Sequence, residues 1–250
     1  MIIATYNSNK KIIVNSKIIW KKLNLNELRI KNYYKYLEFP DVVVNLAWPS
    51  IPNYQLKKHF KTSEAQKKLN YNLINNGLKN IIVLGTCYEY GIVNGQVSEK
   101  HKPRPIIPYA ISKLKLFKNI LKLKKTKKFN FSWLRPFFVY GNNKNRETLY
   151  TLLKKLDQGK IKKLSVCGSL VRDFLSVDYL CKKIIKIIIL NKDLGVLNIS
   201  SGKGITIRAF VRKQIKFKKN LKKIYMNAKN PNYFEPQSFW GDNKKLKRHL

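Results

Sequence analysis

The chain has 250 residues, enough for one large α/β domain with an ample buried core and too many for a peptide-scale scaffold. Its 52 Lys and Arg against 13 Asp and Glu give a formal net charge of +39, but lysines spread along every segment predict a solvated surface and not a stripe that binds nucleic acid. A/T-rich codons explain the frequent Lys, Asn and Ile together, and the positive field would help to capture an anionic substrate.

Cysteine and histidine usage predicts neither a disulfide framework nor a metal site. The three cysteines form no Cys-x-x-Cys pair, and the three histidines lie far apart without ligand spacing. Reduced thiols favour a cytoplasmic location. The N-terminus lacks a signal-peptide pattern, and the most apolar stretch, residues 184–190, is far shorter than the roughly 20 residues that span a bilayer. We therefore expect no membrane partner.

The first part of the chain alternates short apolar runs with segments of helical periodicity. The predicted strands are residues 2–5, 18–23, 42–47, 81–84 and 131–139. The predicted helices are residues 27–39, 55–76 and 109–123. This alternation is typical of a parallel, doubly wound sheet, so the expected fold class is α/β and Rossmann-like.

The pattern changes beyond Gly141. We predict helices at 146–157, 177–190 and 205–210, and short strands at 164–167, 171–176 and 196–199. We expect two parts: residues 1–141, a Rossmann-like part, and residues 142–250, a small and mainly substrate-binding part. Because no low-complexity linker separates them, the two parts are expected to pack as one unit.

One element of dinucleotide-binding folds is missing from the sequence. Such folds begin with a strand that leads into a Gly-rich turn, whose backbone approaches the pyrophosphate at a helix N-terminus. None of the 11 glycines forms Gly-x-Gly-x-x-Gly, and none precedes Gly77. The chain therefore begins at what reads as the second strand, and we expect Met1 to be an internal start. Without its first strand, the sheet would keep unpaired edges or close with altered pairing.

Residues 81–113 contain the candidate catalytic groups. The predicted strand at 81–84 leads to Thr86 at the rim of the sheet, where open α/β sheets bind ligands. Pro108 suits a first helical position, and Tyr109 and Lys113 then lie one turn apart on the same helix face. Tyr-x-x-x-Lys occurs at seven of the 14 tyrosines, so the context distinguishes this one. A hydroxyl, a phenol and an ammonium can then act on one carbonyl.

These motifs resemble the extended short-chain dehydrogenase/reductases of the nucleotide-sugar epimerase/dehydratase group. The resemblance runs over nearly all 250 residues, through segments 42–48, 51–54, 85–91, 108–109, 172–175 and 238–241. It does not include the Gly-rich turn of that group. The resemblance implies hydride transfer between a nicotinamide cofactor, NAD or NADP, and C4 of a nucleotide-diphosphate sugar.

The resemblance also implies roles for the three catalytic candidates. Tyr109 would be the acid and base at the C4 oxygen. A free tyrosine has a pKa near 10, so its phenolate would need the ammonium of Lys113, which would also hold the cofactor ribose. Thr86 would donate a hydrogen bond to the reacting oxygen.

Further binding residues follow from the same resemblance. The cofactor-binding positions are Leu46, Ala47, Trp48, Tyr109, Lys113 and Pro136. The substrate-binding positions are Thr86, Cys87 and Arg172, with the Arg172 guanidinium suited to bidentate binding of a diphosphate. Two alternatives stay open: Arg172 could pair with Asp173, and Trp48 could be a structural cap on the sheet rim.

The reaction that we expect is 4-keto reduction, or the reverse dehydrogenation, of a dTDP-6-deoxyhexose in deoxysugar or polysaccharide biosynthesis. Dehydratases of the group usually follow the catalytic Thr with Asp-Glu, whereas Thr86 is followed by Cys87-Tyr88. A C4 epimerase of the same family and a truncated, non-catalytic homologue are the alternatives. Lys10 and Lys11 weakly favour NADP, and a homodimer is common in the group.

Overall fold

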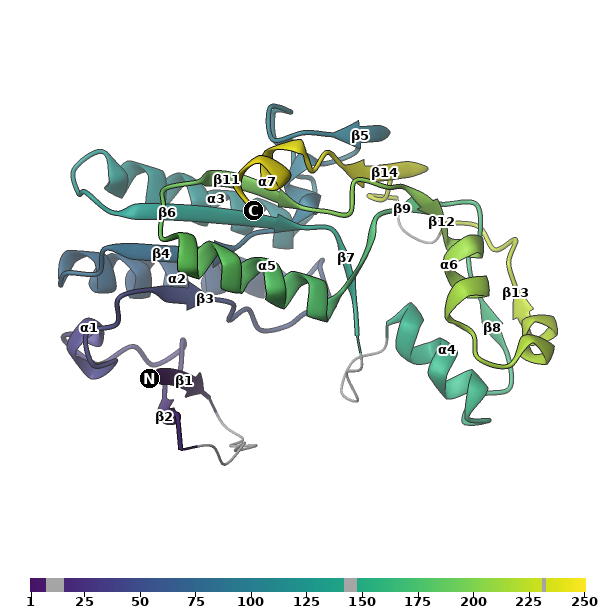
Figure 1. Cartoon of the computed structure of the whole chain (residues 1–250), viewed down its shortest axis with the longest axis horizontal. Helices are drawn as coiled ribbons and strands as arrows, with labels where there is room; N and C mark the ends of the chain where they lie inside the picture. Colours follow the sequence, from purple (N-terminus) through teal and green to yellow (C-terminus); the bar gives the residue numbers. More distant parts are fainter. Residues whose placement is uncertain (8–15, 142–147, 231–232) are drawn as a thin grey trace. The chain divides into compact units, whose positions relative to one another are not determined.

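The computed structural model describes residues 1–7, 16–141, 148–230 and 233–250, and Figure 1 labels its elements. The chain forms two compact units that interleave along the sequence. The first unit comprises Met1–Val83, Ile107–Trp133 and Asn191–Leu194, and the second comprises Leu84–Ile106, Leu134–Leu190 and Gly195–Leu250. The division of roles at residue 141 stays a prediction.

The first unit is built on parallel strands covered by two long helices. Its strands are β3 (Val43–Asn45), β4 (Asn80–Leu84) and the first residues of β6 (Asn130–Pro136), with β4 between the other two. β3 and β4 run parallel, with Val43 opposite Ile81. Ile81, Ile82 and Val83 are buried, as expected of a β-branched run in the middle of a parallel sheet.

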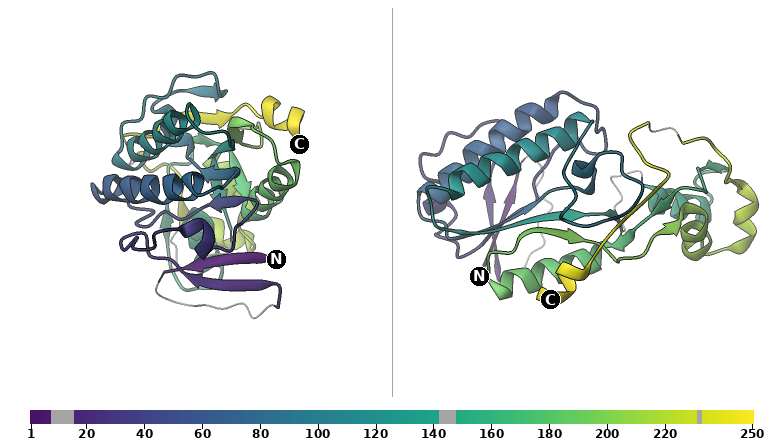
Figure 2. Two further views of the ribbon diagram at one scale, coloured as in Figure 1. Left: turned by 90° about the vertical axis from the view of Figure 1, so that its left-hand side faces the viewer. Right: turned by 90° about the horizontal axis from the view of Figure 1, so that it is seen from above.

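Helices α2 (Lys58–Asn75) and α3 (Pro108–Lys124) lie side by side, as Figure 2 shows. Two hydrogen bonds of 2.8 Å tie them together: the Ser63 hydroxyl donates to the Ser112 carbonyl, and the Tyr71 phenol donates to the Asn119 carbonyl. The predicted helices at 55–76 and 109–123 are thereby confirmed, with ends that differ by a few residues.

The N-terminal segment of the first unit forms a sheet of its own. β1 (Ile2–Tyr6) and β2 (Ile18–Lys22) are parallel, with Ile2 opposite Ile18. Among the described residues, β3 has β4 as its only neighbour, so its other edge is unpaired. An unpaired edge is one of the two outcomes that the sequence leads us to expect.

The predicted helix at 27–39 is wrong in its extent, because α1 contains only Tyr33–Tyr36. Asn32 is the N-cap: its side-chain oxygen accepts a hydrogen bond from the Lys35 backbone N–H, so the helix begins at Tyr33. Glu38 and Phe39 have φ angles of 59° and 54°, in the left-handed region, which ends it.

In its described residues, the second unit combines several short strands with four helices. In it β11 (Gly195–Ile199) lies beside β6, and β7 (Phe138–Tyr140) runs parallel to β10 (Phe174–Ser176). A mixed sheet has the order β12-β9-β14-β5, formed by β12 (Ile205–Thr206), β9 (Val171–Arg172), β14 (Ser238–Gly241) and β5 (Gly95–Val97). β13 (Ile224–Tyr225) pairs with β8 (Leu164–Ser165).

The helices of the second unit are α4 (Leu149–Asp157), α5 (Val177–Leu190), α6 (Ile207–Gln214) and α7 (Lys244–His249), with the 3-10 turns η1 (Cys87–Tyr90) and η2 (Lys218–Lys223). Around α4 and α6 a core cluster contains Leu153, Leu156, Phe210, Val211, Ile215 and Ile224. The helix predicted at 177–190 is confirmed as α5, and the one at 146–157 as α4 from Leu149, with residues 146–147 outside the described ones.

The single strand predicted at 131–139 is wrong, because two strands occupy this range. The chain changes partner between them: Phe137 N donates to the Ile199 carbonyl, and Phe138 N donates to the Asp173 carbonyl. β5, β13, β14 and α7 were not predicted, since they are at most six residues long and carry little periodic signal. No helix in the described ranges combines the length and apolar character needed to cross a bilayer.

Candidate functional site

Tyr109 and Lys113 lie in the first two turns of α3. Pro108 occupies the start of the helix, and Tyr109 N donates to the Tyr54 carbonyl over 3.1 Å. Both side chains are buried, with 7% of Tyr109 and 3% of Lys113 exposed. Because both residues belong to α3, they lie one helical turn apart, as predicted. Both residues are also largely shielded from solvent.

The Lys113 ammonium lies on the face of an indole. Its Nζ is 3.9 Å from the centre of the Trp48 ring and 6.0 Å from the centre of the Tyr109 ring. A cation over an aromatic face is attracted by the ring quadrupole, most strongly for Trp. Trp48 follows β3 and is 7% exposed, so the indole and the ammonium are buried together.

Tyr109 lies close to the rings of Trp48, Tyr54 and His59. The centres of the Tyr54 and His59 rings are each 5.3 Å from the centre of the Tyr109 ring, and that of Trp48 is 6.0 Å away. The Trp48 indole N–H donates to His59 Nδ1 over 3.1 Å, and His59 Nε2 lies 2.8 Å from the Asn53 carbonyl oxygen. His59 is fully buried.

Sequence reasoning missed His59 as part of this cluster. A signal for it exists in α2, where the buried positions recur every three or four residues and are largely polar: His59, Thr62, Ser63, Gln66 and Asn70. A polar stripe with helical period predicts side chains that hydrogen-bond a neighbouring element.

The loop after β3 is held by amides of that stripe. Asn45 Nδ2 donates to Gln66 Oε1 over 2.6 Å and to Asn70 Oδ1 over 2.9 Å, and Gln66 Nε2 donates to the Ala47 carbonyl. Ala47 and Leu46 are exposed beside the buried Trp48. The three predicted cofactor-binding residues of this loop therefore differ in burial.

In the second unit, Thr86 begins η1. Its hydroxyl oxygen accepts a hydrogen bond from Tyr88 N over 3.3 Å, and its own N–H donates to Glu89 Oε1 over 2.9 Å, which forms a capping box. A hydroxyl that accepts one hydrogen bond still has its own proton to donate. Thr86 is thus compatible with the predicted role of a donor to a reacting oxygen.

A buried ion pair holds this turn. Arg135 Nε donates to Glu89 Oε2 over 2.9 Å, and the two side chains are 2% and 0% exposed. The guanidinium also lies 4.6 Å from the centre of the Tyr90 ring. Because Glu89 binds both the Thr86 N–H and Arg135, the position of the threonine depends on a residue of β6.

Cys87 follows Thr86 and is buried, which raises the pKa of its thiol well above its usual range. A buried thiol with a raised pKa is a weak nucleophile, so this environment favours packing or a weak hydrogen bond as the role of Cys87. Pro136, the last residue of β6, is half-buried.

Arg172 is 1% exposed and forms an ion pair with Glu235, with 2.9 Å between Nη2 and Oε2. Asp173 is not its partner, since the Asp173 carboxylate accepts hydrogen bonds from the backbone N–H groups of Ser201, Gly202 and Gly241. Within the described part of the chain, Arg172 Nε has no hydrogen-bond partner.

The predicted site residues divide between the two units. Leu46, Ala47, Trp48, Tyr109 and Lys113 belong to the first, and Thr86, Cys87, Pro136 and Arg172 to the second. The structure brings Trp48, Tyr109 and Lys113 together within the first unit. The convergence of Thr86 on Tyr109 stays a prediction.

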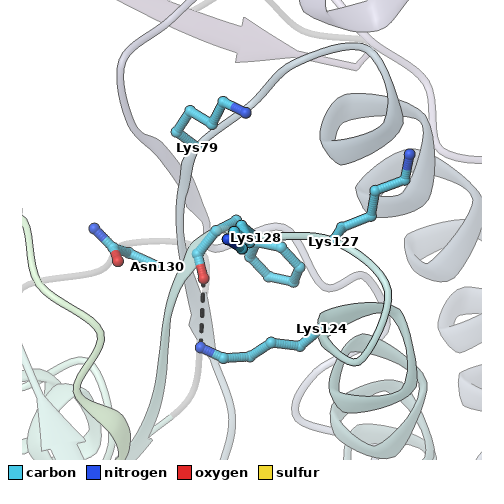
Figure 3. A pocket seen from close by; sticks show the side chains of 6 residues that line it. Lys79, Lys124, Lys127, Lys128 and Asn130 are labelled. Carbon is cyan, nitrogen blue, oxygen red and sulfur yellow. Dashed lines mark hydrogen bonds between the residues drawn. The ribbon is translucent and has the colours of Figure 1, made fainter.

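A hollow of about 470 Å³ at the far end of α3 contains none of these residues. Its lining is Lys79, Lys124, Lys127, Lys128, Phe129 and Asn130, shown in Figure 3 with the Lys124 ammonium donating to the Phe129 carbonyl. A helix rises about 1.5 Å per residue, so Lys124 lies roughly 20 Å along α3 from Tyr109. The hollow is therefore separate from the Tyr109 cluster.

Comparison with known proteins gives consistent results. The profile of the NAD dependent epimerase/dehydratase family matches residues 4–199. The chain is 26% identical over 204 residues to dTDP-6-deoxy-L-talose 4-dehydrogenase (NAD(+)) of Aggregatibacter actinomycetemcomitans, covering 80% of this chain and 75% of the relative. The predicted group is thereby confirmed.

Solved structures share the fold. UDP-N-acetylglucosamine 4-epimerase from Methanobrevibacter ruminantium M1 has a TM-score of 0.79 at 20% identity, covering 93% of this chain and 76% of the other. UDP-glucose 4-epimerase from Thermotoga maritima has a TM-score of 0.78 at 20% identity, covering 98% and 83%. The predicted Rossmann-like α/β class is confirmed.

Replacing Glu89 tests the ion pair that holds Thr86. Glu89→Gln keeps the shape but removes the carboxylate charge that neutralises the buried Arg135, so we expect the free energy of unfolding to fall by about 3–5 kcal/mol. Urea denaturation measures this. The matched control is Glu64→Gln, which breaks the exposed pair with Lys115 and should cost less than about 1 kcal/mol. Equal losses in both variants would contradict the assignment.

The thiols should differ in reactivity. Cys181 is exposed and Cys87 is buried, and both are free. At pH 8 we expect iodoacetamide to alkylate Cys181 in the native protein while Cys87 stays unmodified, because burial raises the pKa of Cys87 and blocks access. Peptide mass spectrometry reads out each site, with alkylation in urea as the control. Rapid alkylation of native Cys87 would show that η1 is open.

Proposed function

The chain belongs to the NAD dependent epimerase/dehydratase family, and on that premise we propose that it is an oxidoreductase that reduces or oxidises C4 of a nucleotide-diphosphate sugar. The favoured substrate is a dTDP-6-deoxyhexose, as the name of the 26% identical relative suggests. The observation that carries the proposal is the buried phenol and ammonium of Tyr109 and Lys113, one turn apart on α3.

The residues fit one end of a nicotinamide dinucleotide. Lys113 offers a charged donor and Tyr109 a phenol at the start of α3, beside the loop after β3. A Gly-rich pyrophosphate cradle is absent from these 250 residues, in which no glycine precedes Gly77. We therefore assign Lys113, Tyr109, Pro136 and the loop of Leu46, Ala47 and Trp48 to the nicotinamide and ribose. When bound, the cofactor would supply or accept the hydride, and the relative's name indicates NAD(+).

The chain's own groups would move the proton. On reduction, the Tyr109 phenol gives its proton to the C4 oxygen while hydride reaches C4; on oxidation, the phenolate takes the proton back. Lys113 would stabilise the phenolate by its charge. Thr86 would donate a hydrogen bond from its hydroxyl to the same oxygen, since accepting from Tyr88 N leaves the O–H available.

Arg172 would bind the diphosphate. A guanidinium is suited to phosphate oxygens, and Arg172 Nε lacks a partner among the described residues. Glu235 occupies Nη2, so an incoming diphosphate would compete with this carboxylate. We assign residues 142–250 mainly to the substrate and residues 1–141 mainly to the cofactor. We also propose a cytoplasmic location and a homodimer.

Epimerisation at C4 would use Thr86, Tyr109 and Lys113 in the same roles and return the hydride to the other face of the ketone. A net redox change in the nicotinamide therefore distinguishes the two reactions. Stoichiometric oxidation of NADH by a 4-keto sugar nucleotide supports the reductase, whereas interconversion of C4 epimers without net cofactor change supports the epimerase.

Calorimetric titration with NADH and NADPH, followed by turnover assays, tests the catalytic assignment. Tyr109→Phe should leave cofactor affinity nearly intact and lower turnover by about 100-fold or more, since only the ionisable hydroxyl is lost. Tyr71→Phe, which removes a phenol on α2 that bonds Asn119, is the matched control and should keep full turnover. Absence of binding heat from either dinucleotide would favour a non-catalytic homologue. Retained turnover in Tyr109→Phe would refute the assignment.

Titration with dTDP and UDP tests the diphosphate site. Arg172→Gln should weaken binding about tenfold through loss of charge-assisted hydrogen bonds. Glu235→Gln should tighten it, because a competing carboxylate is removed; a merely structural ion pair predicts weaker binding in both variants. Affinities measured by fluorescence or calorimetry distinguish a diphosphate site from a merely structural ion pair.

A further inference from the structure

His59 is a fully buried titratable side chain that the proposed reaction does not use. The indole N–H of Trp48 can only donate, so His59 Nδ1 must accept and the ring proton must be on Nε2. Nε2–H then donates to the Asn53 carbonyl over 2.8 Å. Both nitrogens are engaged, and the two hydrogen bonds fix the tautomer and the plane of the imidazole.

The fixed imidazole in turn restrains the indole. The two ring planes are 28° apart with centres 6.4 Å from each other, a nearly coplanar, edge-to-edge arrangement that suits the hydrogen bond between them. On the Trp48 indole lies the Lys113 ammonium, 3.9 Å from the ring centre. The location of this ammonium therefore depends on the indole, and the orientation of the indole depends on His59.

We infer that Trp48 is a positioning residue for Lys113, and that His59 is a positioning residue for Trp48. This inference rests on the proposed function, in which Lys113 acts on the Tyr109 phenol. The indole holds the ammonium 6.0 Å from the centre of the Tyr109 ring before substrate arrives, so the pair is preorganised. Neither residue touches the reacting atoms in this role.

The alternative role of Trp48 is a structural cap on the sheet rim. Both roles predict that loss of the indole lowers stability, so stability alone cannot separate them. Only the positioning role predicts that the environment of the Lys113 ammonium and the ionisation of Tyr109 change when Trp48 or His59 is replaced.

The first measurement needs no cofactor or substrate. Protons on the Lys113 side chain near an indole face should resonate upfield of those of exposed lysines, and ¹³C-labelled lysine reports them by NMR, assigned by difference with Lys113→Gln. We expect Trp48→Leu to return this signal to the position of exposed lysines, and His59→Phe to shift it part of the way. An unshifted Lys113 signal in the unmodified protein would overturn the inference.

The second measurement is kinetic. His59→Phe keeps a ring but removes both hydrogen bonds, and we expect kcat to fall about tenfold with KM for the sugar nucleotide little changed. In the direction of sugar oxidation, which needs the Tyr109 phenolate, the pH at which activity rises should move upward in His59→Phe and in Trp48→Leu, because a displaced ammonium supports the phenolate less. His59→Gln, whose amide oxygen can accept from the indole N–H, should recover part of kcat.

Tyr71→Phe is the matched control, since it also removes a hydrogen bond made by α2 but lies 12 residues, or about 18 Å, further along the helix than His59. It should leave the NMR signal, kcat and the pH profile unchanged. An equal loss of kcat in Tyr71→Phe and His59→Phe would assign His59 a structural role only. If the unmodified chain shows no turnover, the proposed function fails while the NMR experiment still decides where the ammonium lies.

Discussion

The cost of burying a positive charge organises this molecule. Of 52 basic residues, Lys113, Arg135 and Arg172 are the ones buried in the described part of the chain, each at most 3% exposed. An ion removed from water is tolerated only where partners replace its hydration. Each of the three lies over an aromatic ring, at 3.9, 4.6 and 5.2 Å from the centres of Trp48, Tyr90 and Phe138.

The same constraint links folding to the proposed chemistry. In the first unit, the indole that carries the Lys113 ammonium is held by His59, and both contact the ring of Tyr109. In the second unit, the carboxylate that neutralises Arg135 also holds the backbone of Thr86. Groups that are costly to bury concentrate at functional sites, which supports the assignment of these residues to a site. The other Lys and Arg residues that the structure describes are exposed or half-buried.

Much of the fold could be predicted because its signals are local. A continuous β-branched run predicted β4, and a helical period predicted α2, α3 and α5. The predictions failed where tertiary contacts overrode local pattern: a change of strand partner at Phe137 divided one predicted strand into two, and left-handed residues after Tyr36 stopped a predicted helix. The short strands β5 and β14 carry little local signal and are defined by pairing across the sequence: β5 with β14, and β14 also with β9.

The sequence by itself determined that Tyr109 and Lys113 share one face of a helix, because that relation depends only on the helical repeat over four residues. It also determined the α/β class, because short apolar runs alternate with segments of helical periodicity. Only the tertiary structure decided the partners of the buried charges: Trp48 for Lys113, Glu89 for Arg135 across 46 residues, and Glu235 in place of the adjacent Asp173 for Arg172 across 63 residues. Backbone geometry sets neighbours within a turn, whereas packing of distant segments selects which carboxylate or ring reaches a buried cation.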